Sequence, residues 1–248
     1  MALAFFTAIP IFDFYTKLKI VPWIFLNILT YVDNQMKGSI TREIQNGRMK
    51  AEPKRAFYSY ALVDSHKLSS LLKRKQTFSL VPDEAGFAEF ELFKSTIFYI
   101  GKGTNGRKLV HLTQAKMRYL GVKVRGKNTS RLDKIVSLWK NSRGVTILQL
   151  DCDATSREAF CREYAMISAI GLHQLNNVQQ GKCYGEMNNW PGVKIMNYGD
   201  MLLFQLFKQF ISRPASPILP SDVVYNPPVH KKDQKFCTTC KRVLTQRK

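Results

Sequence analysis

Residues 95–120 read STIFYIGKGTNGRKLVHLTQAKMRYL, and no other part of the chain constrains its local structure as tightly. The stretch begins with β-branched and aromatic residues, which favour a strand over 95–100. Gly101 and Gly103 are expected to end this strand, and apolar residues then recur with helical spacing over 105–120. Glycines between a strand and a helix allow backbone N–H groups to approach a phosphate. The G-x-G spacing is common, so this loop alone only indicates a candidate anion site.

On either side of this stretch the chain alternates between strand-like and helix-like segments. The best-defined helix opens with Thr155-Ser-Arg-Glu158, a capping-box pattern, and stops at Gly171. Residues 64–93 show no convincing periodicity. Strands are also expected over 56–63 and 145–150, and helices over 129–141 and 199–212. This order of elements indicates an α/β or α+β fold.

The charge of the chain points to a polyanionic partner. Among its 248 residues, 38 Lys and Arg outnumber 18 Asp and Glu, which gives a formal net charge of +20. Nucleic acid is the first expectation and an anionic membrane surface the second. A basic protein without a polyanionic partner is the remaining alternative. The hydrophobic content of 45% excludes a wholly disordered chain.

The cysteines fit a reducing compartment. Five cysteines at irregular spacing do not make a disulfide scaffold. Cys237 and Cys240 form a single C-x-x-C motif, to which His230 could add a third zinc ligand. A closed structural zinc site usually needs four ligands, so we favour an unstructured basic tail over a zinc site here.

Two apolar runs near the N-terminus raise the question of a membrane. Residues 1–12 and 20–32 are apolar, but both are shorter than the roughly 20 residues that span a bilayer. No basic region precedes the first run, as a secretory signal would require. We therefore expect these segments to pack on the domain or on a partner, and the protein to be intracellular, nuclear or cytoplasmic, and not secreted.

Two helical features bear on function. Arg107, His111, Gln114 and Arg118 form a polar stripe, which is either a solvated face or part of a site. Glu163 lies mid-helix on an apolar stripe, where an unpaired carboxylate is costly to bury. Such a carboxylate is either paired with a cation of the protein or retained to hold a metal ion or a proton.

Together these residues resemble the GIY-YIG nucleases, whose hallmark is two short strands with G-I-Y-like and Y-I-G triplets. The second triplet is Tyr99-Ile100-Gly101, and the first is Tyr58-Ser59-Tyr60, which keeps only the final tyrosine. Within the family, the ankyrin-repeat and LEM-domain endonucleases look most similar, through the stretches Phe98–Arg107, Ala165–Leu172 and Leu175–Asn177. The resemblance covers about residues 56–185. It implies a small, mainly antiparallel sheet flanked by helices in a single catalytic domain.

The resemblance also implies roles for individual residues. Tyr60 is similar to the family's general base, Tyr99 to a residue that orients water or metal ligands, and Arg107 to the arginine that stabilises the transition state. His111 matches a histidine of some members, and Glu163 matches the glutamate that binds Mg²⁺ or Mn²⁺. Contacts to the substrate are expected from Lys102, Gly103, Asn105, Gly106 and Asn177, with Asn176 as a rival for the family's asparagine.

Tyr60 raises a chemical problem, because a phenol near pKa 10 is mostly protonated at neutral pH. It needs the metal, Arg107 or His111 to make it more acidic. We expect Tyr58 to point to the opposite face of the strand and to serve only in packing.

The resulting hypothesis is a metal-dependent endonuclease that acts on DNA, without a small-molecule cofactor or membrane contact. Branched or structured DNA is one candidate substrate, beside single strands and plain duplexes. The first alternative is an inactive nucleic-acid-binding protein on the same fold, and the second is a membrane-surface or scaffold protein that uses residues 1–35. The expected organisation is an N-terminal extension (1–55), the nuclease-like domain (56–185), a helical extension (186–213) and a proline-rich, then basic tail (214–248). The sequence leaves the oligomeric state open.

Overall fold

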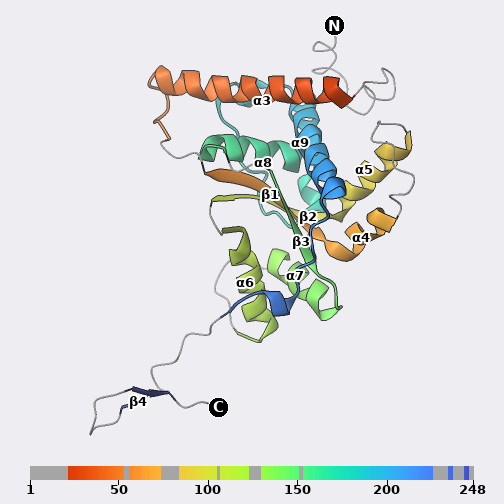
Figure 1. The fold of residues 1–248 in the computed structure, drawn as a ribbon. Coiled ribbons are helices and arrows are strands. Elements are labelled where there is room, and N and C mark those ends of the chain that lie inside the picture. The colour runs from red at the N-terminus through yellow and green to blue at the C-terminus, as the bar shows by residue number, and fades with distance from the viewer. Residues whose placement is uncertain are drawn as a thin grey trace.

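The computed structural model describes residues 22–52, 56–73, 84–104, 107–122, 130–150, 153–225, 234–236 and 243–245. Helices surround a small sheet, with α3 along one side and α6 and α7 at the other end (Figure 1). The elements in chain order are α3 (Pro22–Gln45), β1 (Phe57–Asp64), α4 (Ser65–Lys73), α5 (Glu84–Thr96), β2 (Ile97–Thr104), α6 (Arg107–Tyr119), α7 (Ser130–Lys140), β3 (Val145–Gln149), α8 (Ser156–Ile170), the 3₁₀ turns η2 (Leu172–Gln174) and η3 (Gly185–Asn189), α9 (Gly192–Ser212), η4 (Pro220–Asp222), β4 (Gln234–Phe236) and β5 (Val243–Thr245).

The sheet has the order β2-β1-β3, and both pairings are antiparallel. This confirms the expected α+β fold with a small antiparallel sheet. In the register of β1 and β2, Tyr60 lies opposite Gly101 and Tyr58 lies opposite Gly103. A bulge between Leu62 and Val63 interrupts this pairing. β2 is an edge strand, so one side of its backbone is open to groups from other elements.

The sequence predicted that Gly101 and Gly103 end the second strand, and this prediction was wrong. β2 runs from Ile97 to Thr104 and contains both glycines. Their lack of a side chain leaves room above the strand, and the cross-strand tyrosines occupy that room. Glycine here meets a packing need within the sheet.

The two faces of the sheet have separate apolar cores. Tyr58, Tyr60 and Leu62 of β1 belong to the core shared with α6 and α7. Ala61 and Val63 belong to the larger core, which includes residues of α3, α4, α5, α8 and α9. This alternation follows from the two-residue period of a strand. Both faces of the sheet are therefore covered by helices.

The ends of α8 agree with the sequence. The side chain of Thr155 accepts a hydrogen bond from the backbone of Glu158, and the Glu158 carboxylate accepts one from the backbone of Thr155. This reciprocal pair is the predicted capping box. Gly171 ends the helix with a φ of 93°, which favours glycine. These fixed ends set which residues of α8 face the sheet.

A buried polar network joins α3, α8 and α9. Asp33 accepts two hydrogen bonds from Arg162, at 3.1 and 3.0 Å, and one from the Tyr198 hydroxyl at 2.5 Å. Lys37 completes the cluster at 2.8 Å. Burial tends to raise the pKa of Asp33, but Arg162 and the other donors hold it below its ordinary value. The apolar segment around residues 28–40 thus packs on the domain, as expected for part of the second apolar run.

Helices α4 and α5 occupy much of the region in which the sequence showed no periodicity. Leu68 and Leu71 of α4 and Phe90 and Phe93 of α5 are buried in the larger core. α9 begins at Gly192, earlier than the predicted residue 199. None of the helices within the described ranges combines the length and hydropathy needed to span a bilayer.

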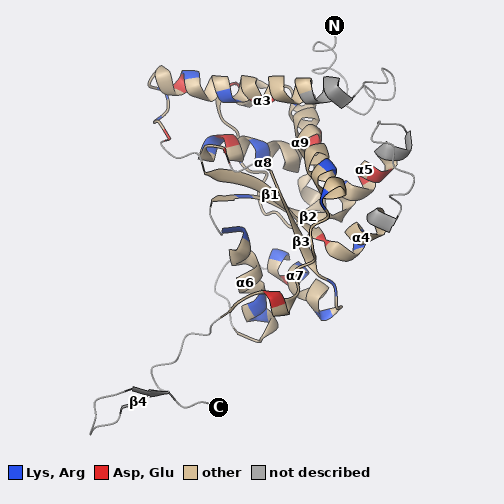
Figure 2. Cartoon of the chain, viewed as in Figure 1, with Lys and Arg blue, Asp and Glu red and all other residues tan. Residues whose placement is uncertain are grey.

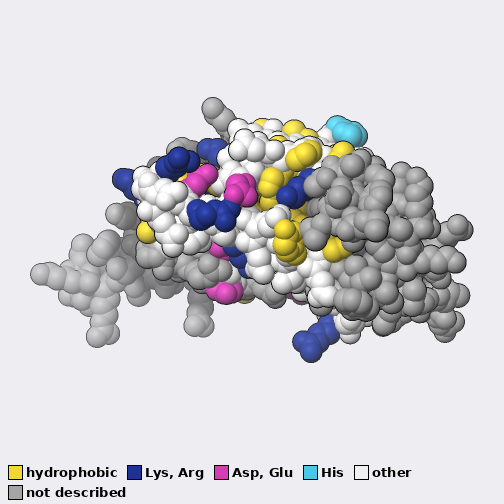
Figure 3. All heavy atoms as spheres, turned by 90° about the horizontal axis from the view of Figure 1, so that it is seen from above, with side chains coloured by type: hydrophobic (Ala, Val, Ile, Leu, Met, Phe, Trp, Pro, Cys, Tyr) yellow, Lys and Arg dark blue, Asp and Glu magenta, His cyan; other side chains and the backbone are white. Residues whose placement is uncertain are grey.

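Charged side chains are spread over several elements. Lys and Arg occur on α6, α7, α8 and α9 (Figure 2). On the face that carries α3, acidic and basic side chains are interspersed, with apolar side chains between them (Figure 3). That face does not present a charge of one sign among its described residues.

Candidate active site

Three aromatic side chains meet between the sheet and α6. The ring of Tyr60 lies 6.2 Å from the ring of Tyr99 and 6.4 Å from that of His111, measured between centroids. The rings of Tyr99 and His111 are 5.6 Å apart with an edge-to-face geometry. The hydroxyl groups of Tyr60 and Tyr99 are also hydrogen-bonded to each other. Three residues that the sequence assigned to catalysis are therefore neighbours.

Gly101 makes this arrangement possible. A β-carbon at this position would lie 2.8 Å from the Tyr60 hydroxyl oxygen and 2.8 Å from a ring carbon of Tyr99. Both distances are shorter than real contacts allow. At Gly103 the corresponding atoms are the Tyr58 hydroxyl at 3.2 Å and Cβ of Arg107 at 3.4 Å. The glycine of the Y-I-G triplet is required by the two tyrosines that lie over it.

Tyr58 lies on the same face as Tyr60, so the expectation of opposite faces was wrong. Side chains two positions apart in a strand share a face, and only Ser59 between them points the other way. The two tyrosine rings are 5.9 Å apart. The Tyr58 hydroxyl accepts a hydrogen bond from the backbone N–H of Lys108 at 3.3 Å. Tyr58 therefore supports the start of α6, next to the site.

Glu163 approaches the same region from α8. Its carboxylate accepts a hydrogen bond from the backbone N–H of Lys102, at the open edge of β2. Burial raises the pKa of Glu163 to about 7, although the positive charges of Lys102 and Arg107 oppose the shift. The negative charge of Glu163 in turn contributes to raising the pKa of Tyr60 and of Tyr99. The carboxylate is thus electrostatically coupled to both tyrosines.

Lys102 extends from β2 toward α8, on the other side of the strand from the tyrosines. Its ammonium group lies 3.5 Å from the ring centroid of Phe160 and 4.9 Å from that of Phe57. It donates a hydrogen bond to the Ser156 hydroxyl at 2.6 Å. Burial lowers the pKa of Lys102, and the nearby Glu163 carboxylate opposes this. The aromatic contacts hold a cation beside the Glu163 carboxylate.

The stripe on α6 divides into two parts. Arg107 is exposed at the first position of the helix, and its charge acts on both Glu163 and His111. His111 faces the tyrosines and is hydrogen-bonded to Gln114. Arg118 instead pairs with Asp133 of α7 at 3.0 Å. The first part of the stripe belongs to the site, and the last part ties the two helices together.

His111 is held neutral. Burial lowers its pKa to about 4, and the positive charges of Arg131 and Arg107 contribute in the same direction. A neutral imidazole can accept a proton or a hydrogen bond but does not add positive charge at neutral pH. It therefore cannot supply the charge that would make Tyr60 more acidic.

Arg131 is the residue of the site that sequence reasoning missed. It comes from the first turn of α7 and is 8% exposed. Its guanidinium carbon lies 4.4 Å from the ring centroid of Tyr99, and the side chain is hydrogen-bonded to the Tyr99 hydroxyl. Burial raises the pKa of Tyr60 above the range of an exposed phenol, and the charge of Arg131 opposes that rise. The helical pattern alone gives no sign that this arginine is buried beside a tyrosine.

Asn177 fastens β2 at its open edge. Its side-chain oxygen accepts a hydrogen bond from the backbone N–H of Ile100 at 3.0 Å, and its nitrogen donates to the Ile100 carbonyl at 2.7 Å. The neighbouring Asn176 donates to the Ser130 hydroxyl at 2.7 Å. Asn177 thus braces the strand between Tyr99 and Gly101. The two further predicted substrate contacts, Asn105 and Gly106, lie outside the described residues, as do Cys237, Cys240 and His230.

The oxygen atoms of Glu163 and of the tyrosines could bind a hard cation such as Mg²⁺ through few protein ligands. Within the described ranges, no group of three or more His, Cys, Asp or Glu side chains is arranged to hold a metal ion. Glu163 is a single, half-buried carboxylate at the backbone of Lys102, close enough for its charge to act on Tyr60 and Tyr99. Mg²⁺ is commonly held by one or two carboxylates, with water and substrate phosphate completing its coordination. The residues present are compatible with that mode and do not form a dedicated cage.

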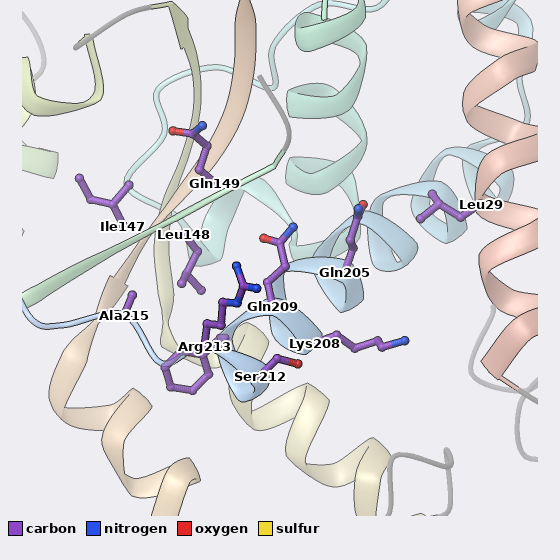
Figure 4. A pocket seen from close by; sticks show the side chains of 11 residues that line it. Leu29, Ile147, Leu148, Gln149, Gln205, Lys208, Gln209, Ser212, Arg213 and Ala215 are labelled. Atoms are coloured by element: carbon purple, nitrogen blue, oxygen red, sulfur yellow. The ribbon is translucent and has the colours of Figure 1, made fainter. Parts of the chain in front are cut away.

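A separate cavity lies along the other edge of the sheet. It has a volume of about 560 Å³ and is lined by residues of β3, α9 and α3 (Figure 4). Gln149, Gln205 and Gln209 contribute amides, and Lys208 and Arg213 contribute positive charges. Because the strand order is β2-β1-β3, the cavity lies beside the edge opposite to that of Tyr99. Gln149 of its lining pairs with Tyr60 on the central strand.

Comparison with known proteins agrees with this geometry. Residues 57–224 match the family model of the LEM-3-like GIY-YIG domain. The chain is 30% identical over 171 residues to the human ankyrin repeat and LEM domain-containing protein 1, covering 67% of this chain and 26% of that protein. The mouse protein of the same name is 27% identical over 166 residues, which cover 67% of this chain and 30% of that protein. The Caenorhabditis elegans homolog is 31% identical over 113 residues, or 46% and 16% of the two chains.

The chain therefore spans less than a third of the length of each of these relatives. No solved structure matches it. The family match includes both strands with tyrosines, the helix of Arg107 and the helix of Glu163. The chain belongs to the GIY-YIG nuclease family, as a LEM-3-like GIY-YIG domain.

Proposed function

We propose that this chain is a metal-dependent endonuclease that hydrolyses phosphodiester bonds in DNA, including branched or structured DNA. The observation that carries the proposal is the electrostatic coupling of one half-buried carboxylate, Glu163, to a hydrogen-bonded pair of tyrosines on the neighbouring strands β1 and β2. Arg107 lies close enough for its charge to act on that carboxylate. The basic character of the chain favours a polyanionic substrate, and a DNA substrate favours a nuclear location.

In this mechanism Tyr60 accepts a proton from the attacking water, and Tyr99 orients the Tyr60 hydroxyl through their hydrogen bond. Arg107 donates to the phosphate oxygens as negative charge develops there, which its planar guanidinium suits well. Glu163 would hold Mg²⁺ or Mn²⁺, which would neutralise charge on the phosphate and lower the pKa of bound water. Asn177 keeps the strand that carries Tyr99 in place.

Tyr60 needs a nearby positive charge to lower the pKa of its hydroxyl. The sequence suggested His111 among the possible sources of this charge, but the structure points to Arg131. His111 is neutral near pH 7, so it acts as a hydrogen-bonding neighbour. The positive charge that opposes the raised pKa of Tyr60 belongs to Arg131. The bound metal would act in the same direction.

A cleavage assay on labelled DNAs tests the proposal. Single strands, plain duplexes, forked duplexes and four-way junctions are incubated with the protein in Mg²⁺, in Mn²⁺ and in a chelator. We expect metal-dependent cleavage of at least one of these DNAs by the wild type and none by Glu163→Gln. If the wild type binds these DNAs but cleaves none of them, the inactive nucleic-acid-binding alternative is favoured instead.

A further inference from the structure

Arg131 is a buried cation for which the described residues provide no carboxylate. No ion pair within the described ranges includes it. The adjoining segments 105–106 and 123–129 contain no Asp or Glu, so they cannot supply one either. Its place in the first turn of α7 is also unfavourable for a positive side chain, because the helix dipole is positive there. Burying a charge without a counter-charge is costly, so the position of Arg131 calls for an explanation other than stability.

Two buried polar atoms near Tyr99 have no hydrogen-bond partner among the described residues. They are Nε of Arg131 and Nδ1 of His111. Both side chains contact Tyr99, since the guanidinium stacks on its ring at 4.4 Å and the imidazole meets it at 5.6 Å. Buried polar atoms are rarely left unsatisfied, so a polar group from outside the chain is expected at this point. The guanidinium and the positive end of α7 favour an anion at this point.

The location of Arg131 complements that of Lys102. Lys102 contacts Phe160 and Ser156 on the α8 side of β2, whereas Arg131 contacts Tyr99 on the α6 and α7 side. Positive charges therefore lie on both sides of the edge strand that carries Tyr99. A nucleic-acid backbone that crosses this edge presents successive phosphates, each with its own negative charge.

We propose that Arg131, together with the Nδ1 atom of His111, forms a second phosphate subsite, which binds a backbone phosphate next to the one that is cleaved. The ring of Tyr99 keeps the guanidinium plane in position, and Nε and the imidazole donate to the phosphate oxygens. This inference rests on the proposed nuclease function for the nature of the ligand. It assigns Arg131 to substrate binding, in addition to its influence on the tyrosines.

DNA binding in a chelator tests the subsite without requiring cleavage. The affinity of the full chain for a fluorescent duplex is measured by anisotropy over a range of salt concentrations. Arg131→Met should weaken binding about 10-fold or more, as expected for a lost hydrogen bond to a charged group. It should also lower the slope of log affinity against log salt by about 0.9, since one phosphate contact is lost. Wild-type affinity and slope in this variant would overturn the proposal.

Two further variants provide controls. Lys140→Gln removes one positive charge from the exposed end of α7 and should lower the slope by less than Arg131→Met. An equal effect of the two variants would contradict a specific subsite. Arg131→Lys keeps the charge, so its slope should match the wild type while its affinity falls part of the way. Wild-type affinity in Arg131→Lys would count against a contact that uses the planar guanidinium.

Thermal unfolding separates binding from folding. Replacing a buried cation by an apolar side chain of similar length should leave the melting temperature of Arg131→Met unchanged or higher. A lower melting temperature together with unchanged DNA binding by the folded fraction would assign Arg131 a structural role instead. If the wild type binds DNA with the expected slope but shows no metal-dependent cleavage, the proposed catalysis fails while the subsite stands.

Discussion

The hydroxyl oxygen of Tyr60 lies 2.8 Å from the position that a β-carbon would take on Gly101. The two residues face each other across the β1–β2 pair, so the distance is set by the register of the sheet. The glycine of the second triplet and the last tyrosine of the first are therefore one structural unit. This explains why a Y-I-G triplet needs a glycine in mid-strand, where glycine usually weakens a strand.

Gly101→Ala should displace both tyrosines. The added methyl group meets Tyr60 and Tyr99, so we expect a loss of about 1–3 kcal/mol in the free energy of unfolding and a severe loss of cleavage. Urea unfolding and single-turnover cleavage measure the two effects. Gly103→Ala, with wider contacts, should be milder. Gly38→Ala on α3, where nothing lies within 4 Å, should be neutral or stabilising. Similar effects of all three variants would refute the packing argument.

Glu163→Gln should abolish cleavage and stabilise the metal-free protein at alkaline pH. The pKa of Glu163 rises from 4.5 to about 7 on folding, so the folded state holds the extra proton between these values. The destabilisation by ionised Glu163 is absent below pH 4.5, grows as the pH rises, and is complete above pH 7. Thermal unfolding should show the variant more stable by roughly 1–3 kcal/mol above pH 7 and equal to the wild type at low pH. A constant difference across this range would contradict the shift.

His111 should affect stability with the opposite sign. Its pKa falls from 6.5 to about 4 on folding, so only the unfolded state takes up a proton between these values. Its contribution to stability is therefore full above pH 6.5 and is lost as the pH falls toward 4. His111→Gln should be less sensitive to acid over this interval in urea unfolding experiments. Equal acid sensitivity of variant and wild type would show that the imidazole is protonated in the folded state.

Tyr60→Phe should mainly lower the cleavage rate and Tyr58→Phe should mainly lower stability, although both rings lie on the same face of β1. Loss of the Tyr60 hydroxyl should lower the single-turnover rate by about 100-fold, as is typical of losing general-base help. Loss of the Tyr58 hydroxyl removes its hydrogen bond to Lys108, which should cost about 1 kcal/mol of stability with little change in rate. A large loss of rate in Tyr58→Phe with normal rate in Tyr60→Phe would reverse the assignment.

Asn177→Ala should release the edge of β2. The variant loses both hydrogen bonds to Ile100, so we expect about 1–3 kcal/mol of destabilisation and a lower cleavage rate. Asn176→Ala loses the side-chain contact to Ser130 and keeps its backbone bond to Phe98, so it should be milder. Unfolding and cleavage measured side by side decide which asparagine braces the strand. A milder effect in Asn177→Ala would transfer that role to Asn176.

Much of the fold could be predicted where local chemistry decides the structure. The capping box at Thr155 and the stop at Gly171 depend on nearby residues, and both were found where expected. α4 has only nine residues, which gives too few turns for a period to be recognised. Gly103 was expected in a loop because glycine usually ends a strand, and only the cross-strand partner Tyr58 shows why it does not.

The composition of the site was harder to predict than its motif residues. Glu163 was noticed because a carboxylate on an apolar stripe conflicts with its surroundings. Arg131 gave no such signal, since an arginine in the first turn of a helix usually lies in solvent. Its burial follows from the packing of α7 against the sheet, which brings residues 32 positions apart in the chain, Tyr99 and Arg131, into contact. Long-range contacts of this kind cannot be inferred from the spacing of residues in one segment.

The hydrogen-bond network around Asp33 indicates that the smallest part of the chain able to fold by itself is longer than the region that matches the family. The family match begins at residue 57, but Val32, Met36 and Ile40 of α3 are almost wholly buried. A fragment limited to the matched region would expose the apolar surface under α3 and leave Arg162 buried without its carboxylate, one residue before Glu163. Helix α3, which lies outside the matched region, thus stabilises α8, the helix that carries the proposed metal ligand Glu163. Fragments for biochemical work should therefore retain α3.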